Sequence, residues 1–194
     1  MSRLDNKVAV ITGAGSGIGR AIALAFAKEG SKVVITCRTA ETGEETVRMI
    51  KEASGKAMFI KTDVSKTEDV RNMVKTTVDT YGKLDVLVNN AAIVREEGSI
   101  VDCPEEYFDR IIAINLKGVW LGMKCAIPEM VKAGGGSIIN VSAVGALEAL
   151  PGIALYSASK GALFSLSRVG LLSLLPRTFE ATVLHPGRSL RRYY

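Results

Sequence analysis

The amino-acid sequence predicts an α/β fold, a Rossmann-like doubly wound parallel sheet in a three-layer αβα arrangement, formed by a single domain over residues 1–194. Two observations predict it. Short apolar runs alternate with longer helical segments, which is the pattern of consecutive βαβ units. A glycine-rich loop directly follows the first of these runs. With 194 residues, 47% of them hydrophobic, the chain is long enough to bury one substantial core.

Five apolar runs are expected to form the strands, over 7–12, 32–36, 57–61, 84–88 and 137–141. The segments between them predict helices over 17–29, 41–53, 66–81 and 104–132. Gly30 follows the first helix at the position where a left-handed glycine is favoured. Ser65, with Glu68 three residues later, predicts a capping box at the start of the third helix.

Composition argues against several classes of protein and site. The chain has three scattered cysteines (Cys37, Cys103 and Cys125) and one histidine, so neither a disulfide framework nor a metal site is expected. The sequence contains no run of 18 apolar residues and no signal-peptide pattern. We therefore expect a cytoplasmic protein without a membrane partner.

The net charge of +5 arises mostly in the C-terminal segment. Residues 170–194 contain four arginines and one glutamate, a net charge of 4 − 1 = +3, so residues 1–169 carry only +2. A phosphate-tracking surface needs a clustered basic face with aromatic residues, and the sequence shows neither, so nucleic acid is not an expected partner. The alternative is a basic arm made of Arg188, Arg191 and Arg192 that binds a polyanion.

The strongest binding signal is the run Thr12-Gly-Ala-Gly-Ser-Gly-Ile-Gly19, which follows the first strand and opens the first helix. Glycines allow a tight turn and a close approach of the backbone to a pyrophosphate, and the helix N-terminus offers free N–H groups. In this strand–turn–helix context the run predicts a dinucleotide site. The alternative is a purely structural turn.

The end of the second strand bears on the choice of dinucleotide. An NAD-selective site usually carries an acidic residue here for the ribose hydroxyls, but the sequence reads Thr36-Cys37-Arg38. The guanidinium of Arg38 could donate charge-assisted hydrogen bonds to a 2′-phosphate. NADP(H) is therefore favoured and NAD(H) remains possible, the alternative for Arg38 being a solvated loop residue.

Four polar residues are candidates for catalysis. Tyr156 and Lys160 are four residues apart and share one face of a helix, where an ammonium would lower the pKa of the phenol. Ser142 follows the fifth strand at its carboxyl end, and Asn115 interrupts an apolar helix. Each has an ordinary alternative: a surface pair, a strand-end serine, or a solvent-facing asparagine.

Together these motifs resemble the classical short-chain dehydrogenase/reductase (SDR) family over about residues 5–169. The matching pieces are the glycine run 12–19, Asp63-Val64, Asn89-Asn-Ala-Ala92, Asn115, Ser142 and Tyr156-Ser-Ala-Ser-Lys160. The resemblance implies an NAD(P)-dependent oxidoreductase that interconverts a secondary alcohol and a ketone by hydride transfer. It also implies a homo-oligomer, a dimer or tetramer. Ala92 stands where the family usually has glycine.

The resemblance also implies a role for each matching residue. Tyr156 would be the general acid/base, Ser142 would bond the substrate oxygen, Lys160 would hold the nicotinamide ribose, and Asn115 would hold a water in a proton relay. The implied cofactor-binding residues are Thr12, Gly13, Ser16, Gly17, Ile18, Gly19, Arg38, Asp63, Val64, Asn89, Ala91, Tyr156 and Lys160.

Residues 170–194 do not follow the family pattern. A one-base deletion near codon 170 would explain them, because the neighbouring reading frame permits a family-like continuation; the alternative is a genuinely divergent tail. On the frameshift interpretation we expect a sixth strand over 180–184 at best, with the last strand and the substrate loop missing. A second functional hypothesis follows, namely a truncated, inactive dinucleotide-binding fragment or pseudoenzyme.

Overall fold

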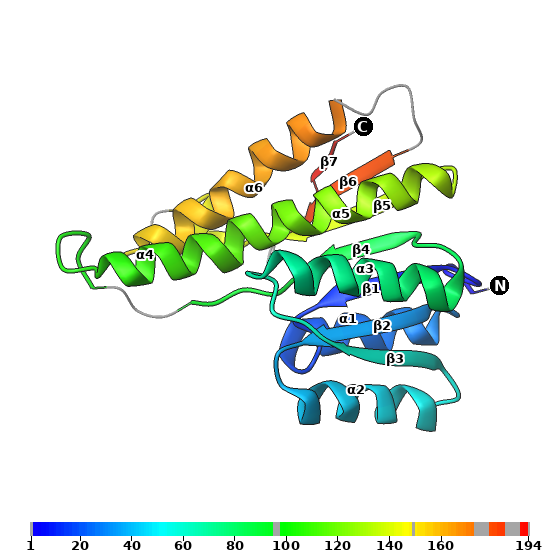
Figure 1. Ribbon diagram of the computed structural model, residues 1–194. Coiled ribbons are helices and arrows are strands. Elements are labelled where there is room, and N and C mark those ends of the chain that lie inside the picture. The colour runs from blue at the N-terminus through cyan, green and yellow to red at the C-terminus, as the bar shows by residue number, and fades with distance from the viewer. Residues whose placement is uncertain (1, 95–97, 149, 173–178, 185–190, 194) are drawn as a thin grey trace.

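The strands of the protein form one sheet with the order β3-β2-β1-β4-β5-β6-β7 (Figure 1). The computed structural model describes residues 2–94, 98–148, 150–172, 179–184 and 191–193, with side chains described up to Gly170. The strands are β1 (Val8–Thr12), β2 (Lys32–Cys37), β3 (Lys56–Lys61), β4 (Val86–Asn89), β5 (Gly136–Val141), β6 (Phe179–Leu184) and β7 (Arg191–Tyr193). The predicted doubly wound parallel sheet is confirmed, since β1 to β6 pair in parallel.

Helices cover both faces of the sheet. They are α1 (Gly17–Lys28), α2 (Ala40–Glu52), α3 (Thr67–Tyr81), α4 (Glu105–Ile112), the π-helical η1 (Ala113–Lys117), α5 (Gly118–Lys132), the short 3₁₀ segment η2 (Val144–Ala146) and α6 (Ala154–Leu172). Alternate residues of β1 belong to two separate cores, as the period of a strand requires. Ala9 and Ile11 pack with residues of α1 and α2, whereas Val10 packs with residues of α3 and α5.

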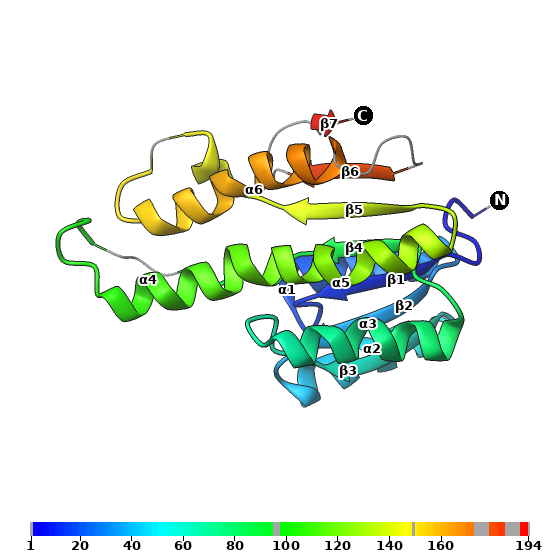
Figure 2. The same ribbon diagram turned by 45° about the horizontal axis from the view of Figure 1, so that its top comes forward.

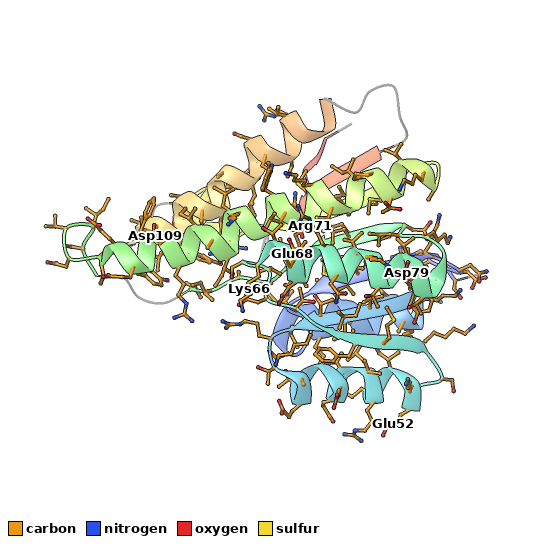
Figure 3. All side chains as sticks on the ribbon, in the orientation of Figure 1. Glu52, Lys66, Glu68, Arg71, Asp79 and Asp109 are labelled. Atoms are coloured by element: carbon orange, nitrogen blue, oxygen red, sulfur yellow. The ribbon has the colours of Figure 1, made fainter. Side chains whose placement is uncertain are left out.

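Helix α3 shows how one face of a helix is buried. Val70, Met73 and Val74 are buried in the core, at the spacing of one helical face. The outer face carries Arg71, which bonds Glu68 at 2.6 Å on the solvent side (Figure 3). Such exposed pairs contribute little to stability, so the apolar face fixes the helix on the sheet.

The start of α3 corrects one prediction. The capping box is wrong, because no side chain caps α3 and Lys66 occupies the N-cap position. The hydroxyl of Ser65 donates instead to Asp63 Oδ1 at 2.7 Å, and the Ser65 N–H bonds the same oxygen at 3.0 Å. The predicted glycine after α1 is confirmed, since Gly30 has a φ of +86°.

The predicted helix 104–132 is continuous but contains a π-helical turn at η1. It runs along the sheet and extends beyond its edge (Figure 2). By length and composition alone the segment Glu105–Lys132 could cross a membrane, although half of its most apolar 18-residue window is buried within the fold. A core helix of a folded domain passes the same test.

Residues 170–194 contain more regular structure than the sequence predicts. The expected sixth strand is present as β6, and β7 pairs with it antiparallel, through Val183 with Arg191. β7 therefore forms one edge of the sheet, which the sequence did not predict. Arg188 lies outside the described residues, and the frameshift stays a prediction.

Candidate active site

The glycine-rich loop connects β1 to α1 at the carboxyl edge of the sheet. Gly13 has a φ of +66°, and a Cβ at Gly19 would lie 2.4 Å from the Gly13 carbonyl oxygen, so both positions require glycine. Helix α1 begins at Gly17 without a side-chain cap from Ser16. Its first N–H groups and the positive end of its dipole are thus available to an anion.

A cleft of about 300 Å³ lies against this loop. Its walls come from the glycine loop and from the residues after β2, β3 and β4, at the point where the strand order reverses between β1 and β4. Open α/β sheets bind ligands at such a switch point. The predicted cofactor residues that line the cleft are Gly13, Ser16, Arg38, Asp63, Val64 and Ala91.

Other predicted cofactor residues lie next to this cleft or behind it. The buried hydroxyl of Thr12 accepts the N–H groups of Asn90 (2.9 Å) and Ala91 (3.0 Å), which fixes the cleft-lining segment after β4. Gly17 and Gly19 form the first turn of α1, and Ile18 between them is 54% exposed.

Asn89 does not line the cleft. Its side chain is buried and donates to Asn140 Oδ1 at 2.9 Å, and Asn140 in turn donates to the Ser167 hydroxyl at 2.8 Å. A Cβ at Gly122 would lie 2.5 Å from Asn89 Oδ1, so the amide points toward α5. Asn89 therefore joins β4 to β5 and α5 inside the core, and its neighbour Asn90 lines the cleft.

Arg38 and Asp63 bring opposite charges into the cleft. Arg38 is exposed at the end of β2, and Asp63 follows β3. Burial alone would raise the pKa of Asp63, but the hydroxyl and N–H of Ser65 donate to the carboxylate and the charges of Arg38 and Lys66 lie nearby. The pKa of Asp63 consequently lies below its ordinary value, and the carboxylate is ionised at neutral pH.

Five lining residues were missed by the sequence analysis, namely Cys37, Thr39, Thr42, Thr62 and Ile114. Cys37 ends β2, and Thr39 and Thr62 follow β2 and β3, whereas Thr42 lies in the first turn of α2 and Ile114 in η1. The rule that ligands lie at the carboxyl ends of parallel strands would have found three of them. Thr42 depends on how α2 packs beside the glycine loop.

The cleft has the features that a nicotinamide dinucleotide requires. Positions 13 and 19 have no room for a side chain, and an uncapped helix N-terminus suits a pyrophosphate. Arg38 supplies a cation where the adenine ribose would lie in such a site. The residues present therefore fit this cofactor.

The four predicted catalytic residues lie on adjoining elements. Ser142 follows β5, Tyr156 and Lys160 lie on α6, and Asn115 lies in η1. The Ser142 hydroxyl donates to the main-chain carbonyl of Lys160 at 3.0 Å, and Lys160 Nζ donates to the Val141 carbonyl at 2.7 Å. The end of β5 and the first turns of α6 are thereby held together.

Asn115 is fully buried in the π-helical turn. Its Oδ1 accepts the Ile93 N–H and its Nδ2 donates to the Ile93 carbonyl, both at 2.9 Å. The same Nδ2 lies 3.2 Å from the Ser159 hydroxyl, which donates to the Tyr156 carbonyl at 2.7 Å. The side-chain amide thus joins the segment after β4 to α6, and the water-holding role implied by the resemblance stays a prediction.

The electrostatics of α6 also differ from the sequence expectation. Burial lowers the pKa of Lys160 to about 8. Burial raises the pKa of Tyr156, where we expected the neighbouring ammonium to lower it. The difference arises because desolvation disfavours both charged forms, the ammonium and the phenolate.

Comparison with known proteins places these features in one family. The family model for short chain dehydrogenases matches residues 7–189, twenty residues beyond the predicted boundary at 169. An uncharacterized oxidoreductase from Thermotoga maritima is 49% identical over 183 residues, which cover 94% of this chain and 72% of that protein. Dehydrogenase/reductase SDR family member 4 from Sus scrofa is 38% identical over 184 residues, covering 95% of this chain and 66% of that protein.

A solved structure agrees with these sequence matches. The crystal structure of a candidate short-chain alcohol dehydrogenase from Sinorhizobium meliloti 1021 matches with a TM-score of 0.86 at 32% identity. The match covers 91% of this chain and 69% of that one. Family membership implies a nicotinamide dinucleotide cofactor, which agrees with the cleft described above. The chain belongs to the short-chain dehydrogenase family of oxidoreductases.

Proposed function

We propose that the chain binds NADP(H) in the cleft and interconverts a secondary alcohol and a ketone by hydride transfer, with Tyr156 as general acid/base. One observation carries the proposal. The side chain of Asn115 bonds Ile93, which lines the cleft, and also bonds Ser159, the residue before Lys160. A single buried amide therefore connects the cofactor cleft to the helix that carries Tyr156 and Lys160.

In this proposal the cofactor supplies or accepts the hydride when bound, and the side chains handle the proton. The Tyr156 hydroxyl donates its proton to the ketone oxygen during reduction and removes it from the alcohol during oxidation. The Ser142 hydroxyl bonds the same oxygen after rotating away from the Lys160 carbonyl. Lys160 stabilises the phenolate and holds the nicotinamide ribose.

The preference for NADP(H) is supported by the charges at the end of β2. Arg38 is exposed in the cleft and can bond a 2′-phosphate through its guanidinium. The acid in the same cleft, Asp63, already accepts two hydrogen bonds from Ser65. A 2′-phosphate beside Arg38 would therefore meet an exposed cation, while the Asp63 carboxylate is engaged by the hydroxyl and N–H of Ser65.

Turnover tests the proposal. The wild-type chain is assayed for NADPH and NADH oxidation with a panel of aliphatic, cyclic and aryl ketones, and for the reverse reaction with the matching alcohols. Tyr156→Phe should lower kcat by about 10²- to 10⁴-fold, because a positioned acid/base contributes that much. Its affinity for NADPH should fall far less than kcat, because the cleft residues that would bind the rest of the dinucleotide are unchanged. Tyr81→Phe, at the end of α3, is the matched control and should leave kcat unchanged.

Each result has a defined meaning. Turnover that depends on Tyr156 and is faster with NADPH supports the proposal. NADPH binding without turnover of any substrate would instead support the second hypothesis, an inactive dinucleotide-binding protein. Equal kcat for the wild type and Tyr156→Phe would show that Tyr156 is not the acid/base.

A further inference from the structure

Arg20, in the first turns of α1, connects the glycine loop to α2. Its Nη2 donates to the Gly15 carbonyl and lies 3.4 Å from the Thr42 carbonyl, and its Nε donates to the Thr46 hydroxyl at 3.0 Å. The side chain is half-buried between the two helices. A planar guanidinium can bond several acceptors in one fixed geometry, which an ammonium on a flexible stem cannot do.

Thr46 extends the same connection. It is fully buried, and its hydroxyl lies 3.0 Å from the Ala14 carbonyl and 3.1 Å from the Thr42 carbonyl. Two consecutive carbonyls of the glycine loop, those of Ala14 and Gly15, are therefore bonded to side chains on the helices behind the loop. These bonds fix the direction of the loop's peptide groups.

The loop is also packed tightly on this side. A Cβ at Gly15 would lie 2.5 Å from Thr42 Oγ1 and 2.8 Å from Cys37 Sγ. A glycine is needed here because the end of β2 and the start of α2 pack directly against the loop. The absence of a side chain at Gly15 lets the loop lie close to β2 and α2, and its carbonyl bonds Arg20.

The direction of one carbonyl sets the direction of the next N–H. A trans peptide is planar, so the Gly15 carbonyl and the Ser16 N–H point in opposite directions. Because the Gly15 carbonyl bonds Arg20, the Ser16 N–H points away from Arg20. Gly15 and Ser16 both line the cleft.

We infer that Arg20 is a positioning residue for the pyrophosphate of the dinucleotide, an inference that rests on the proposed function. Arg20 holds the Gly15 carbonyl away from the cleft, so that the Ser16 N–H and the N-terminus of α1 face the phosphates. Without Arg20 the carbonyl becomes free to turn toward the cleft, where its oxygen would repel a phosphate. Arg20 itself does not touch the ligand.

Ligand fragments test this function. Arg20→Lys keeps the charge and loses the forked geometry, and calorimetry measures its affinity for NADPH, 2′,5′-ADP and 2′-AMP. Affinity for the first two ligands should fall about tenfold, the size of one lost charge-assisted hydrogen bond. Affinity for 2′-AMP should stay unchanged, because that ligand has no 5′-phosphate. Arg48→Lys, an exposed arginine of α2 paired with Glu45 and Glu52, is the matched control and should change none of the three.

A second pair of variants covers the case in which Arg20→Lys folds poorly. Thr46→Val removes the hydroxyl that bonds Arg20 Nε. It should lower the affinity for NADPH and 2′,5′-ADP, but not for 2′-AMP, by a smaller factor than Arg20→Lys does. Thr46→Ser retains the hydroxyl and should bind like the wild type. Thermal unfolding of every variant without ligand separates a loss of affinity from a loss of folding.

The outcomes are distinguishable. If Arg20→Lys loses affinity equally for all three ligands and unfolds at a lower temperature, Arg20 has a purely structural function and the inference is overturned. Unchanged affinity for NADPH in Arg20→Lys would also overturn it. If the wild type binds none of the three ligands, the proposed function itself fails and the inference fails with it.

Discussion

The proposed cofactor cleft and the proposed catalytic cluster differ in how they hold their polar groups. In the cleft Arg38 and Ser16 are exposed, and the glycine loop presents backbone to the open side. In the cluster, defined as Asn115, Ser142, Tyr156 and Lys160, three side chains are almost fully buried. Asn115 is 0%, Ser142 3% and Lys160 2% exposed, and each bonds the protein's own backbone.

This difference predicts how the two regions respond to mutation. A buried polar group contributes to stability through its partners, and removing it leaves those partners unsatisfied. An exposed group loses little when removed, because water replaces its partners. Substitutions in the cluster should therefore change stability and activity together, whereas substitutions in the cleft should change affinity alone.

The largest effect on stability is expected for Asn115→Ala. The change leaves the part-buried N–H and carbonyl of Ile93 without their partner, and it removes the amide N–H that the Ser159 hydroxyl accepts. The free energy of unfolding should fall by about 4 kcal/mol, as for a broken buried hydrogen-bond network. Urea unfolding measures it, with Asn72→Ala on the exposed face of α3 as control, expected within about 0.5 kcal/mol of the wild type. A loss below about 1 kcal/mol would show that the network is not a stabilising element.

Lys160→Met should change the free energy of unfolding in the opposite direction and stabilise the protein. The pKa of Lys160 is lowered by burial from 10.5 to about 8, so the buried ammonium costs about 3 kcal/mol at neutral pH. Methionine removes that cost and leaves the Val141 carbonyl unpaired, which costs about 1 kcal/mol. The variant should therefore be more stable than the wild type by about 2 kcal/mol at pH 7, and inactive.

The stabilisation by Lys160→Met should depend on pH. It is fully present below the native pKa of about 8, where Lys160 is charged in both the native and the unfolded state. It shrinks as the pH rises toward 10.5, because the native lysine is then neutral while the unfolded one is still protonated. Urea unfolding at pH 7 and pH 10 measures the change, with Lys75→Met on the surface of α3 as control. A difference that stays constant with pH would contradict the lowered pKa.

Much of the fold could be predicted because it depends on local patterns. The apolar runs and the helical segments follow from the spacing of apolar residues, and the glycine at position 30 follows from the end of α1. The capping box failed because two patterns competed for one hydroxyl. Ser65 bonds the carboxylate two residues before it instead of the N–H groups of α3.

The site was predictable where it depends on chain position and not where it depends on packing between elements. Arg38 and Asp63 follow strands, so their place at the carboxyl edge could be predicted. Asn89 was placed wrongly, although strand alternation gives it the same face as Leu87, which packs toward α5. The contact of Arg20 with α2 and that of Asn115 with Ile93 join segments far apart in sequence, and no local pattern signals them.

The smallest effect on stability is expected for Arg38→Ala, which tests the cleft side of the comparison. Arg38 is exposed, and the pKa of Asp63 is lowered by the hydrogen bonds from Ser65 as well as by the nearby charge of Arg38. The free energy of unfolding should therefore change by less than about 0.5 kcal/mol. Affinity for NADPH should fall about tenfold or more, because a charge-assisted bond to the 2′-phosphate is lost. Affinity for NADH should stay the same.

Calorimetry with both dinucleotides measures the ratio of the NADPH affinity to the NADH affinity, and Arg48→Ala should alter neither affinity. Equal losses for NADPH and NADH would place Arg38 away from the 2′-phosphate and leave the choice of dinucleotide to other residues of the cleft.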